Sequence, residues 1–204
     1  MSPKKPKILL VEGIDDQHVS WALFEKHAIP ETFTVIDSKG INNLLIQLPV
    51  RFKESEINTI GVIIDADTNS AGRWQQLRDI LAAEGVVLPA SPAENGTIVE
   101  GKKKIGVWIM PNNRINGMLE DFIASLVPAN DPLLPIAEAA LNNIEQQQLS
   151  KYIPAHRSKA LIHTWLSWQE DPGTPMGSAI TKRYLNTDAA ISQTFLLWIS
   201  TLFG

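Results

Sequence analysis

Cysteine is absent from the 204 residues of this sequence. That absence excludes disulfide bonds, thiolate nucleophiles and any zinc or iron–sulfur site built on cysteine. A chain without cysteine suits the reducing cytoplasm, and we therefore predict a cytoplasmic location. Four histidines are present, but none stands in a His-Glu-x-x-His motif or a similar spacing, so we expect no zinc site on histidine either.

Long hydrophobic runs are also missing. The apolar run at 8–11, "ILLV", is too short for the core of a signal peptide or for a membrane span. The last residues, 188–204, carry a stripe of large apolar side chains, but the segment is too short to span and lacks a cationic polar face. We therefore expect no membrane association.

The sequence has no large excess of charge of either sign. Its net charge of −4 argues against a dedicated basic protein that binds nucleic acid, because such proteins usually present a strongly positive face. Carboxylates gathered around a divalent cation would, however, offset part of that negative charge locally. The net charge therefore makes a nucleic-acid partner less expected without excluding one. With 44% hydrophobic and 20% charged residues, the chain has the composition of a globular protein that buries a core.

Strand and helix patterns alternate in the first half of the chain. This order is typical of a mostly parallel sheet covered by helices. From about Pro128 onwards the pattern is helical with proline breaks. We therefore predict an α/β domain at 1–127 and a helical extension at 128–204 packed on the same core. The expected strands are 7–13, 33–40, 57–67 and one or two within 96–111; the expected helices are 15–29, 41–52 with an interruption near Pro49, 72–85 and 117–127.

Acidic residues lie where three of the predicted strands end. Glu12 ends the first strand, Asp65 and Asp67 end the third, and Glu120 opens the helix that follows "VWIMP" and its loop. In an open α/β sheet, ligands bind beyond the carboxyl ends of the strands. Carboxylates that cluster there repel one another unless a cation offsets them, and Mg²⁺ prefers oxygen ligands. The pattern therefore indicates a divalent-metal site at this edge of the sheet.

Three segments, "LLVEGIDD", "GVIIDAD" and "MLEDF", occur in the order in which the Toprim domain carries its acidic residues. The chain resembles that domain, which occurs in topoisomerases, in primases and in nucleases of the OLD family. It most resembles stand-alone Toprim-like proteins of the DUF3226 type, over about residues 7–125 and also in the helical tail. The resemblance implies a Toprim-like, mostly parallel sheet flanked by helices, with a C-terminal helical extension.

The resemblance also implies roles for individual residues. Glu12 matches an acidic residue that serves as general acid or base in topoisomerases and as a metal ligand in OLD-like nucleases. The implied ligands of Mg²⁺ or Mn²⁺ are Glu12, Asp16, Asp65, Asp67 and Glu120, with Asp121 as a helper. OLD-like nucleases use a downstream lysine to stabilise developing charge, and Lys159 is the first candidate here and Lys182 the second. The implied catalytic set is Glu12, Asp65, Asp67 and Lys159.

Two functions from different classes follow. The first is a metal-dependent nuclease acting on DNA or RNA. The second is a non-catalytic, Toprim-derived module that binds nucleic acid, a nucleotide or a partner protein. No Gly-x-x-x-x-Gly-Lys-Ser/Thr loop occurs, so an ATPase would have to come from a separate partner. A Rossmann-like nucleotide binder is not favoured, because no glycine-rich phosphate loop follows the first strand.

Simpler structural roles compete at several of these residues. Asp15 is best explained as a cap of the first helix, whereas a cap and a functional role are equally plausible for Asp16. Asp65 and Asp67 also suit a turn after a strand. Glu120 and Asp121 lie about 100° apart around a helix, so we expect only one to face the site. The basic cluster at 156–159 suits a phosphate backbone, but a surface cluster without a role is the simpler explanation.

Overall fold

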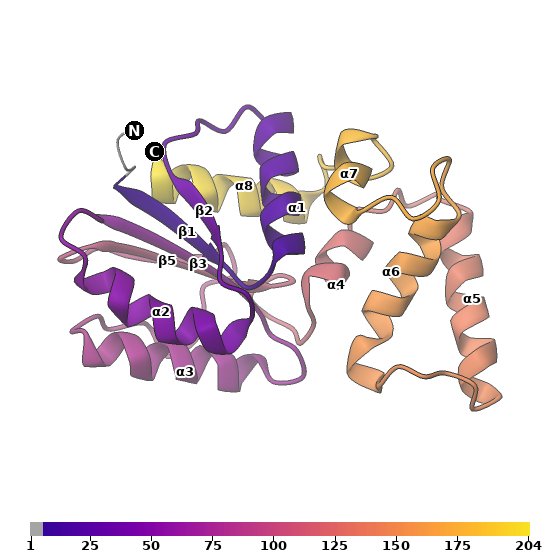
Figure 1. Cartoon of the computed structure of the whole chain (residues 1–204), viewed down its shortest axis with the longest axis horizontal. Helices are drawn as coiled ribbons and strands as arrows, with labels where there is room; N and C mark the ends of the chain where they lie inside the picture. Colours follow the sequence, from indigo (N-terminus) through magenta and orange to yellow (C-terminus); the bar gives the residue numbers. More distant parts are fainter. Residues whose placement is uncertain (1–5) are drawn as a thin grey trace.

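A five-stranded sheet forms the centre of the computed structural model, which describes residues 6–204 (Figure 1). The spatial order is β2-β1-β3-β5-β4, and all neighbours are parallel except β4 and β5. The predicted α/β class with a mostly parallel sheet is therefore confirmed. The strands are β1 (Lys7–Val11), β2 (Thr34–Asp37), β3 (Thr59–Asp65), β4 (Thr97–Val99) and β5 (Lys104–Met110).

Helices cover both faces of this sheet (Figure 1). On one face, α2 (Ile41–Lys53) and α3 (Ser70–Ala83) bury apolar side chains such as Leu44 and Leu77 against the strands. On the other face lie α1 (Ile14–Lys26), α4 (Leu119–Ala124) and the C-terminal helix α8 (Ala190–Phe203). Burial on both faces explains why the central strands read as continuous apolar runs.

The predicted interruption at Pro49 is wrong, because α2 continues through this proline to Lys53. Proline removes one backbone hydrogen bond and usually kinks a helix. Here Leu44, Leu48 and Phe52 are all buried on the same side of α2. The burial of this apolar face stabilises the helix on both sides of Pro49.

The tail forms a helical extension that returns to the sheet. Helices α5 (Leu133–Gln146) and α6 (Arg157–Ser167) lie beside each other at one end of the molecule, and a short 3₁₀ helix (Pro154–His156) precedes α6 (Figure 1). After α7 (Met176–Thr181), which packs on α1, α8 lies against β3 and β5. Its Phe195 and Trp198 contact Trp108 of β5 within the core.

Two glycines make room for α8 on the sheet. Gly61 of β3 and Gly106 of β5 stand opposite each other in register. A methyl group at Gly106 would lie 2.4 Å from Leu202 of α8, and one at Gly61 would lie 2.9 Å from Phe203. The end of α8 therefore packs directly on the backbone of β3 and β5, and a side chain at either glycine would overlap it. None of the helices within residues 6–204 is long and apolar enough to cross a membrane.

Candidate functional site

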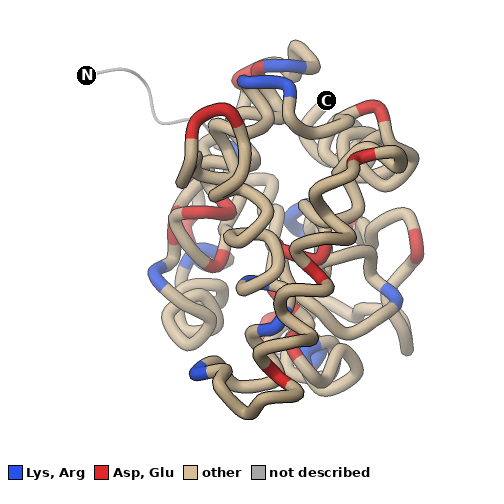
Figure 2. The backbone as a smooth tube through the Cα atoms, turned by 90° about the vertical axis from the view of Figure 1, so that its right-hand side faces the viewer, with Lys and Arg blue, Asp and Glu red and all other residues tan. Residues whose placement is uncertain are grey.

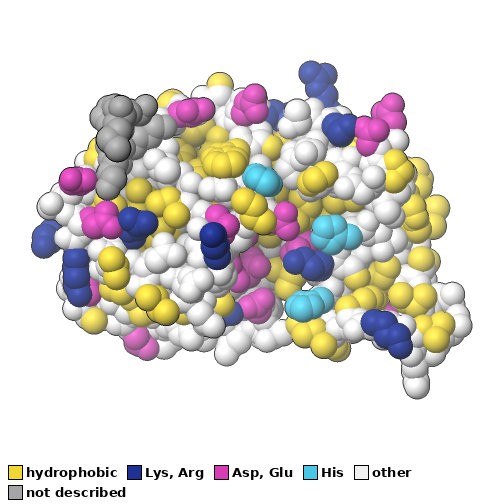
Figure 3. Space-filling view, viewed as in Figure 1, with side chains coloured by type: hydrophobic (Ala, Val, Ile, Leu, Met, Phe, Trp, Pro, Cys, Tyr) yellow, Lys and Arg dark blue, Asp and Glu magenta, His cyan; other side chains and the backbone are white. Residues whose placement is uncertain are grey.

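All six residues of the predicted site line one cavity of about 350 Å³ at the carboxyl ends of β1 and β3. The helical extension supplies the opposite wall through α6 and the residue before it. In the space-filling view, acidic side chains gather near the middle of this face, with basic and histidine side chains beside them (Figure 3). The residues are Glu12, Asp16, Asp65, Asp67, Glu120 and Lys159, and His156 joins them.

Glu12 and Asp65 meet although they are 53 residues apart in the chain. Glu12 Oε2 accepts a hydrogen bond from the backbone N–H of Asp65 over 3.3 Å. Asp65 Oδ1 in turn accepts from the N–H of Leu119, the first residue of α4, over 2.9 Å. The parallel pairing of β1 with β3 produces this contact, because it aligns the ends of the two strands. Each carboxylate thus uses one oxygen to accept a backbone hydrogen bond from another element: Glu12 accepts from β3, and Asp65 accepts from α4.

Asp16 reaches the same cavity from the first turn of α1. The helix begins at Ile14, so Asp16 is its third residue, and its Oδ2 accepts from the N–H of Gly13 over 3.1 Å. The predicted cap at Asp15 is wrong, because that side chain is exposed and the third helical position is the one that reaches back. The other oxygen of Asp16, Oδ1, is buried and has no hydrogen-bond partner among residues 6–204.

Asp67 lies beyond the end of β3, where it lines the acidic cavity and also pairs with Arg73. Its φ of 50° and a reciprocal pair of backbone hydrogen bonds with Gly117, each 2.8 Å, turn the chain and bring Asp67 to the same cavity as Asp65. Asp67 Oδ2 also lies 2.6 Å from a terminal nitrogen of Arg73 on α3. Arg73 was not among the predicted site residues. The sequence signal that could have indicated it is its position, about one helical turn after the turn that carries Asp65 and Asp67.

Glu120 is buried at the start of α4 and pairs with Lys159 of α6, whose Nζ lies 3.1 Å from Glu120 Oε1. Asp121 does not line the cavity. It accepts hydrogen bonds from the N–H of Met118 and the hydroxyl of Ser158 instead. Lys182, the second lysine candidate, is exposed and pairs with Asp171, away from this cavity.

Burial and mutual repulsion raise the pKa values of Asp65, Asp16 and Glu12. Burial, and then the charges of Asp16, Glu12 and Glu120, raise the pKa of Asp65 to about 9. Burial and the charge of Glu12 raise the pKa of Asp16 to about 7. Burial also raises the pKa of Glu12, although the Asp65 N–H and the charges of Arg73 and Lys159 oppose that rise. A cation bound among these groups would favour their charged forms.

The donor atoms suit a hard divalent cation, but they are not yet gathered around one point. Within residues 6–204, no three His, Asp or Glu side chains form a group that could hold a metal ion as they stand. All candidate donors are carboxylate oxygens, the type that Mg²⁺ and Mn²⁺ prefer. The unpartnered Oδ1 of Asp16 is the clearest sign of a missing ligand. The chemistry of the set therefore fits such an ion.

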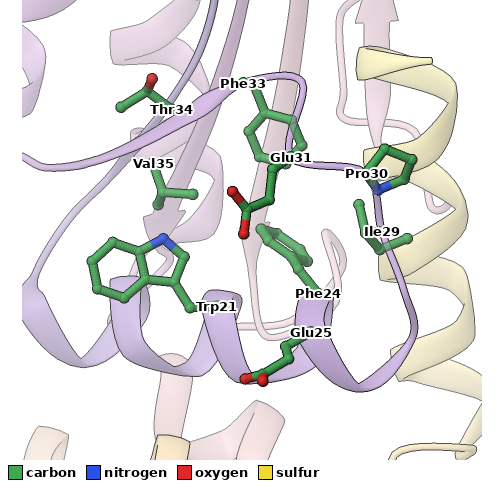
Figure 4. Close-up of a pocket in the computed structure, with 9 residues that line it drawn as sticks. All are labelled: Trp21, Phe24, Glu25, Ile29, Pro30, Glu31, Phe33, Thr34 and Val35. Atoms are coloured by element: carbon green, nitrogen blue, oxygen red, sulfur yellow. The ribbon is translucent and has the colours of Figure 1, made fainter. Parts of the chain in front are cut away.

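A larger cavity of about 570 Å³ lies elsewhere, between α1 and the edge strand β2 (Figure 4). The side chains of Trp21, Phe24 and Phe33 line it, together with two glutamates. It contains none of the acidic residues at the strand ends. Cavity size therefore does not mark the chemically distinctive site of this molecule.

Comparisons with known proteins find one similar solved structure and one matching family model. A solved structure of the C-terminal region of the Xanthomonas campestris pv. campestris OLD protein is similar, with a TM-score of 0.53 and 16% sequence identity. The similarity covers 98% of this chain and 97% of the other, so the helical extension is part of the shared fold. Comparison with curated protein sequences gives no match. A family model described as "Protein of unknown function (DUF3226)" matches residues 6–204, and the chain therefore belongs to the DUF3226 family.

Proposed function

We propose that this protein is a Toprim-type, divalent-metal-dependent nuclease that cleaves phosphodiester bonds of DNA or RNA. One observation carries the proposal: carboxylates from the end of β1, the start of α1 and the end of β3 converge on one cavity, and Asp16 presents a buried oxygen without a partner. An unpartnered buried carboxylate oxygen is costly, and a ligand that binds it removes that cost.

Mg²⁺ or Mn²⁺ is the proposed ligand. Glu12, Asp16 and Asp65 would hold it through the oxygens that do not accept backbone hydrogen bonds, with Asp67 and Glu120 beside them. Such an ion supplies Lewis-acid polarisation of a phosphoryl oxygen and lowers the pKa of a bound water.

The helical extension would supply the positive charge that a phosphodiester needs. Lys159 lies at the rim of the cavity, where its side chain is half exposed. Burial lowers its pKa, but the pairing with Glu120 and the charges of Asp15 and Asp65 together outweigh burial and raise it. It would therefore stay protonated and stabilise charge that develops on a phosphate oxygen. His156 lines the same wall.

We also propose a cytoplasmic location and a separate ATPase or other protein partner. The lack of cysteine and of a phosphate-binding loop supports these two proposals. Seen from the side of the helical extension, acidic and basic positions are interspersed along the chain (Figure 2). The net charge of −4 offers no strong overall attraction for nucleic acid, which is consistent with a partner that recruits the substrate.

A non-catalytic module that binds nucleic acid, a nucleotide or a partner protein is the second candidate. The observation that favours it is the lack, within residues 6–204, of a ready-made group of metal ligands. Two of the carboxylates, Asp67 and Glu120, are also already paired with side-chain cations.

Metal titration combined with a cleavage assay separates the candidates. Isothermal titration with Mn²⁺ and Mg²⁺, and incubation with plasmid, single-stranded DNA and RNA, would be applied to wild type, Glu12→Gln and Asp65→Asn. Asp188→Asn is the matched control, because Asp188 is exposed and does not line the cavity. Binding and cleavage that persist in the control and disappear in both site variants support the nuclease. Binding without cleavage supports the module, and no binding by the folded wild type overturns the metal proposal.

A further inference from the structure

Arg73 is fixed beside Asp67 by its position in α3. Asn69 caps this helix by accepting a hydrogen bond from the N–H of Gly72 over 2.9 Å, so the helix starts directly after the Asp67 turn. Arg73 is therefore one turn into the helix, and its guanidinium lies 2.6 Å from Asp67 while also donating to Gln76 over 3.3 Å. The Arg73 side chain is only 20% exposed.

Asp67 is equally constrained on its side of the pair. Its left-handed backbone conformation and its two hydrogen bonds to Gly117 fix the direction from which its carboxylate leaves the chain. The charges of both Asp67 and Arg73 reach Glu12, where they shift the pKa in opposite directions. The pair is thus part of the electrostatics of the site, although Arg73 itself does not line the acidic cavity.

The pair also borders a second cavity. Asp67 lines both the acidic cavity and a second one of about 500 Å³ along α3, which Arg73, Thr68 and Asn69 line as well. A phosphodiester chain that runs from one cavity to the other would pass the guanidinium. Arginine matches the oxygens of a phosphate as well as those of a carboxylate.

We propose that Arg73 takes the place of a second divalent cation in this site. One divalent ion binds through Glu12, Asp16 and Asp65, and the guanidinium beside Asp67 supplies the second positive charge toward the phosphodiester. A second divalent ion at Asp67 would have to share this carboxylate with the guanidinium, which lies 2.6 Å from Oδ2, and the two positive charges would repel each other. This inference rests on the proposed metal-dependent function and assigns the number of ions and the role of Arg73.

Counting bound Mn²⁺ tests the inference without using activity. Isothermal titration should find one Mn²⁺ per wild-type chain and one in Arg78→Gln, a control on the same helix whose guanidinium contacts Gln75. Arg73→Gln should bind a second Mn²⁺. Electron paramagnetic resonance should then show coupling between two manganese ions, which sit about 4 Å apart in two-metal sites. Two ions in the wild type, or one in Arg73→Gln, would overturn the inference and leave the proposed function standing.

Asp67→Asn provides a second test that does not depend on the folding of the arginine variant. Because Asp67 is not a ligand of the single ion, this variant should still bind one Mn²⁺, with an affinity within about threefold of wild type. Asp65→Asn should lose binding while keeping its circular dichroism spectrum. Loss of binding in Asp67→Asn would overturn the inference, whereas no binding by the wild type would overturn the proposed function itself.

Discussion

Asp16 illustrates how single residues of this site serve structure and chemistry together. One carboxylate oxygen caps the backbone at Gly13, and the other is buried without a partner. Asp65 divides its oxygens in a similar way, since Oδ1 accepts from Leu119. The backbone contacts hold the carboxylates close together, and their repulsion is the energetic consequence.

At the residue scale, we predict that Asp65→Asn stabilises the metal-free protein. The raised pKa of Asp65, about 9, means that folding at pH 8 requires this carboxyl to take up a proton. Asparagine is neutral, has a similar shape and keeps the oxygen that accepts from Leu119. The free energy of unfolding in urea at pH 8 with EDTA should rise by at least about 1 kcal/mol. A variant that is no more stable than wild type would contradict the repulsion argument.

At the scale of elements, the site depends on how α4, α6 and α8 dock. Asp121 binds the N-terminus of α4 and the hydroxyl of Ser158 on α6, and the neighbouring residues Glu120 and Lys159 form the ion pair. Helix α8 packs on the opposite end of the sheet, over Gly61 and Gly106. The contacts between α4 and α6 position the site, and the packing of α8 on the sheet holds the helical extension on the α/β domain.

We predict that Ser158→Ala loosens α6. Loss of the hydroxyl removes one hydrogen bond to a carboxylate, a change of about 1.5–3 kcal/mol for a charged partner. Hydrogen exchange at amides of α6 should become faster than in wild type. Ser167→Ala is the control, because its hydroxyl contacts only the carbonyl of Thr164 in its own helix. Equal exchange in both variants would show that the contact with Asp121 does not hold α6.

We predict that Gly106→Ala destabilises the fold, because its methyl group would overlap Leu202. Overpacking of this kind costs about 1–3 kcal/mol. Urea denaturation should show the loss relative to Gly101→Ala, whose methyl group would lie 3.8 Å from its nearest neighbour. A Gly106→Ala protein as stable as the control would mean that α8 does not pack closely on β5.

At the scale of the whole molecule, the metal-free protein should lose stability as the pH rises. The pKa values of Asp16 and Asp65 are raised in the folded state, from 3.8 to about 7 and about 9. The folded state therefore binds more protons than the unfolded state above pH 4, and stability falls until the pH exceeds the folded values. The loss is at most about 1.4 kcal/mol per pH unit for each group. Urea denaturation between pH 5 and pH 9 with EDTA measures it, and a rise in stability over this range would contradict the prediction.

Excess Mn²⁺ should reverse this trend. A cation that binds only the folded state stabilises it, and its carboxylate ligands must be deprotonated to bind. The melting temperature should therefore rise more on addition of Mn²⁺ at pH 8 than at pH 5. The same rise in Asp65→Asn as in wild type would contradict the proposed site.

The sequence alone determined the alternation of strands and helices and the acidic residues at the strand ends. Local patterns carry this information: a continuous apolar run marks a buried strand, and a carboxylate that ends the run lies at the edge where parallel strands finish. Burial of Leu44, Leu48 and Phe52 overrode the local signal of Pro49, and the helix start at Ile14 transferred the capping role from Asp15 to Asp16.

Only the tertiary structure decided which side chains pair across the site. Arg73 pairs with Asp67 because the turn after β3 directs α3 back past the cavity, and Lys159 rather than Lys182 meets Glu120 because α6 docks on α4. The packing of α8 on Gly61 and Gly106 likewise brings together residues that lie far apart in the chain, such as Gly61 and Phe203. Such contacts depend on the relative placement of whole elements, which the packing of the core sets and which no short stretch of sequence encodes.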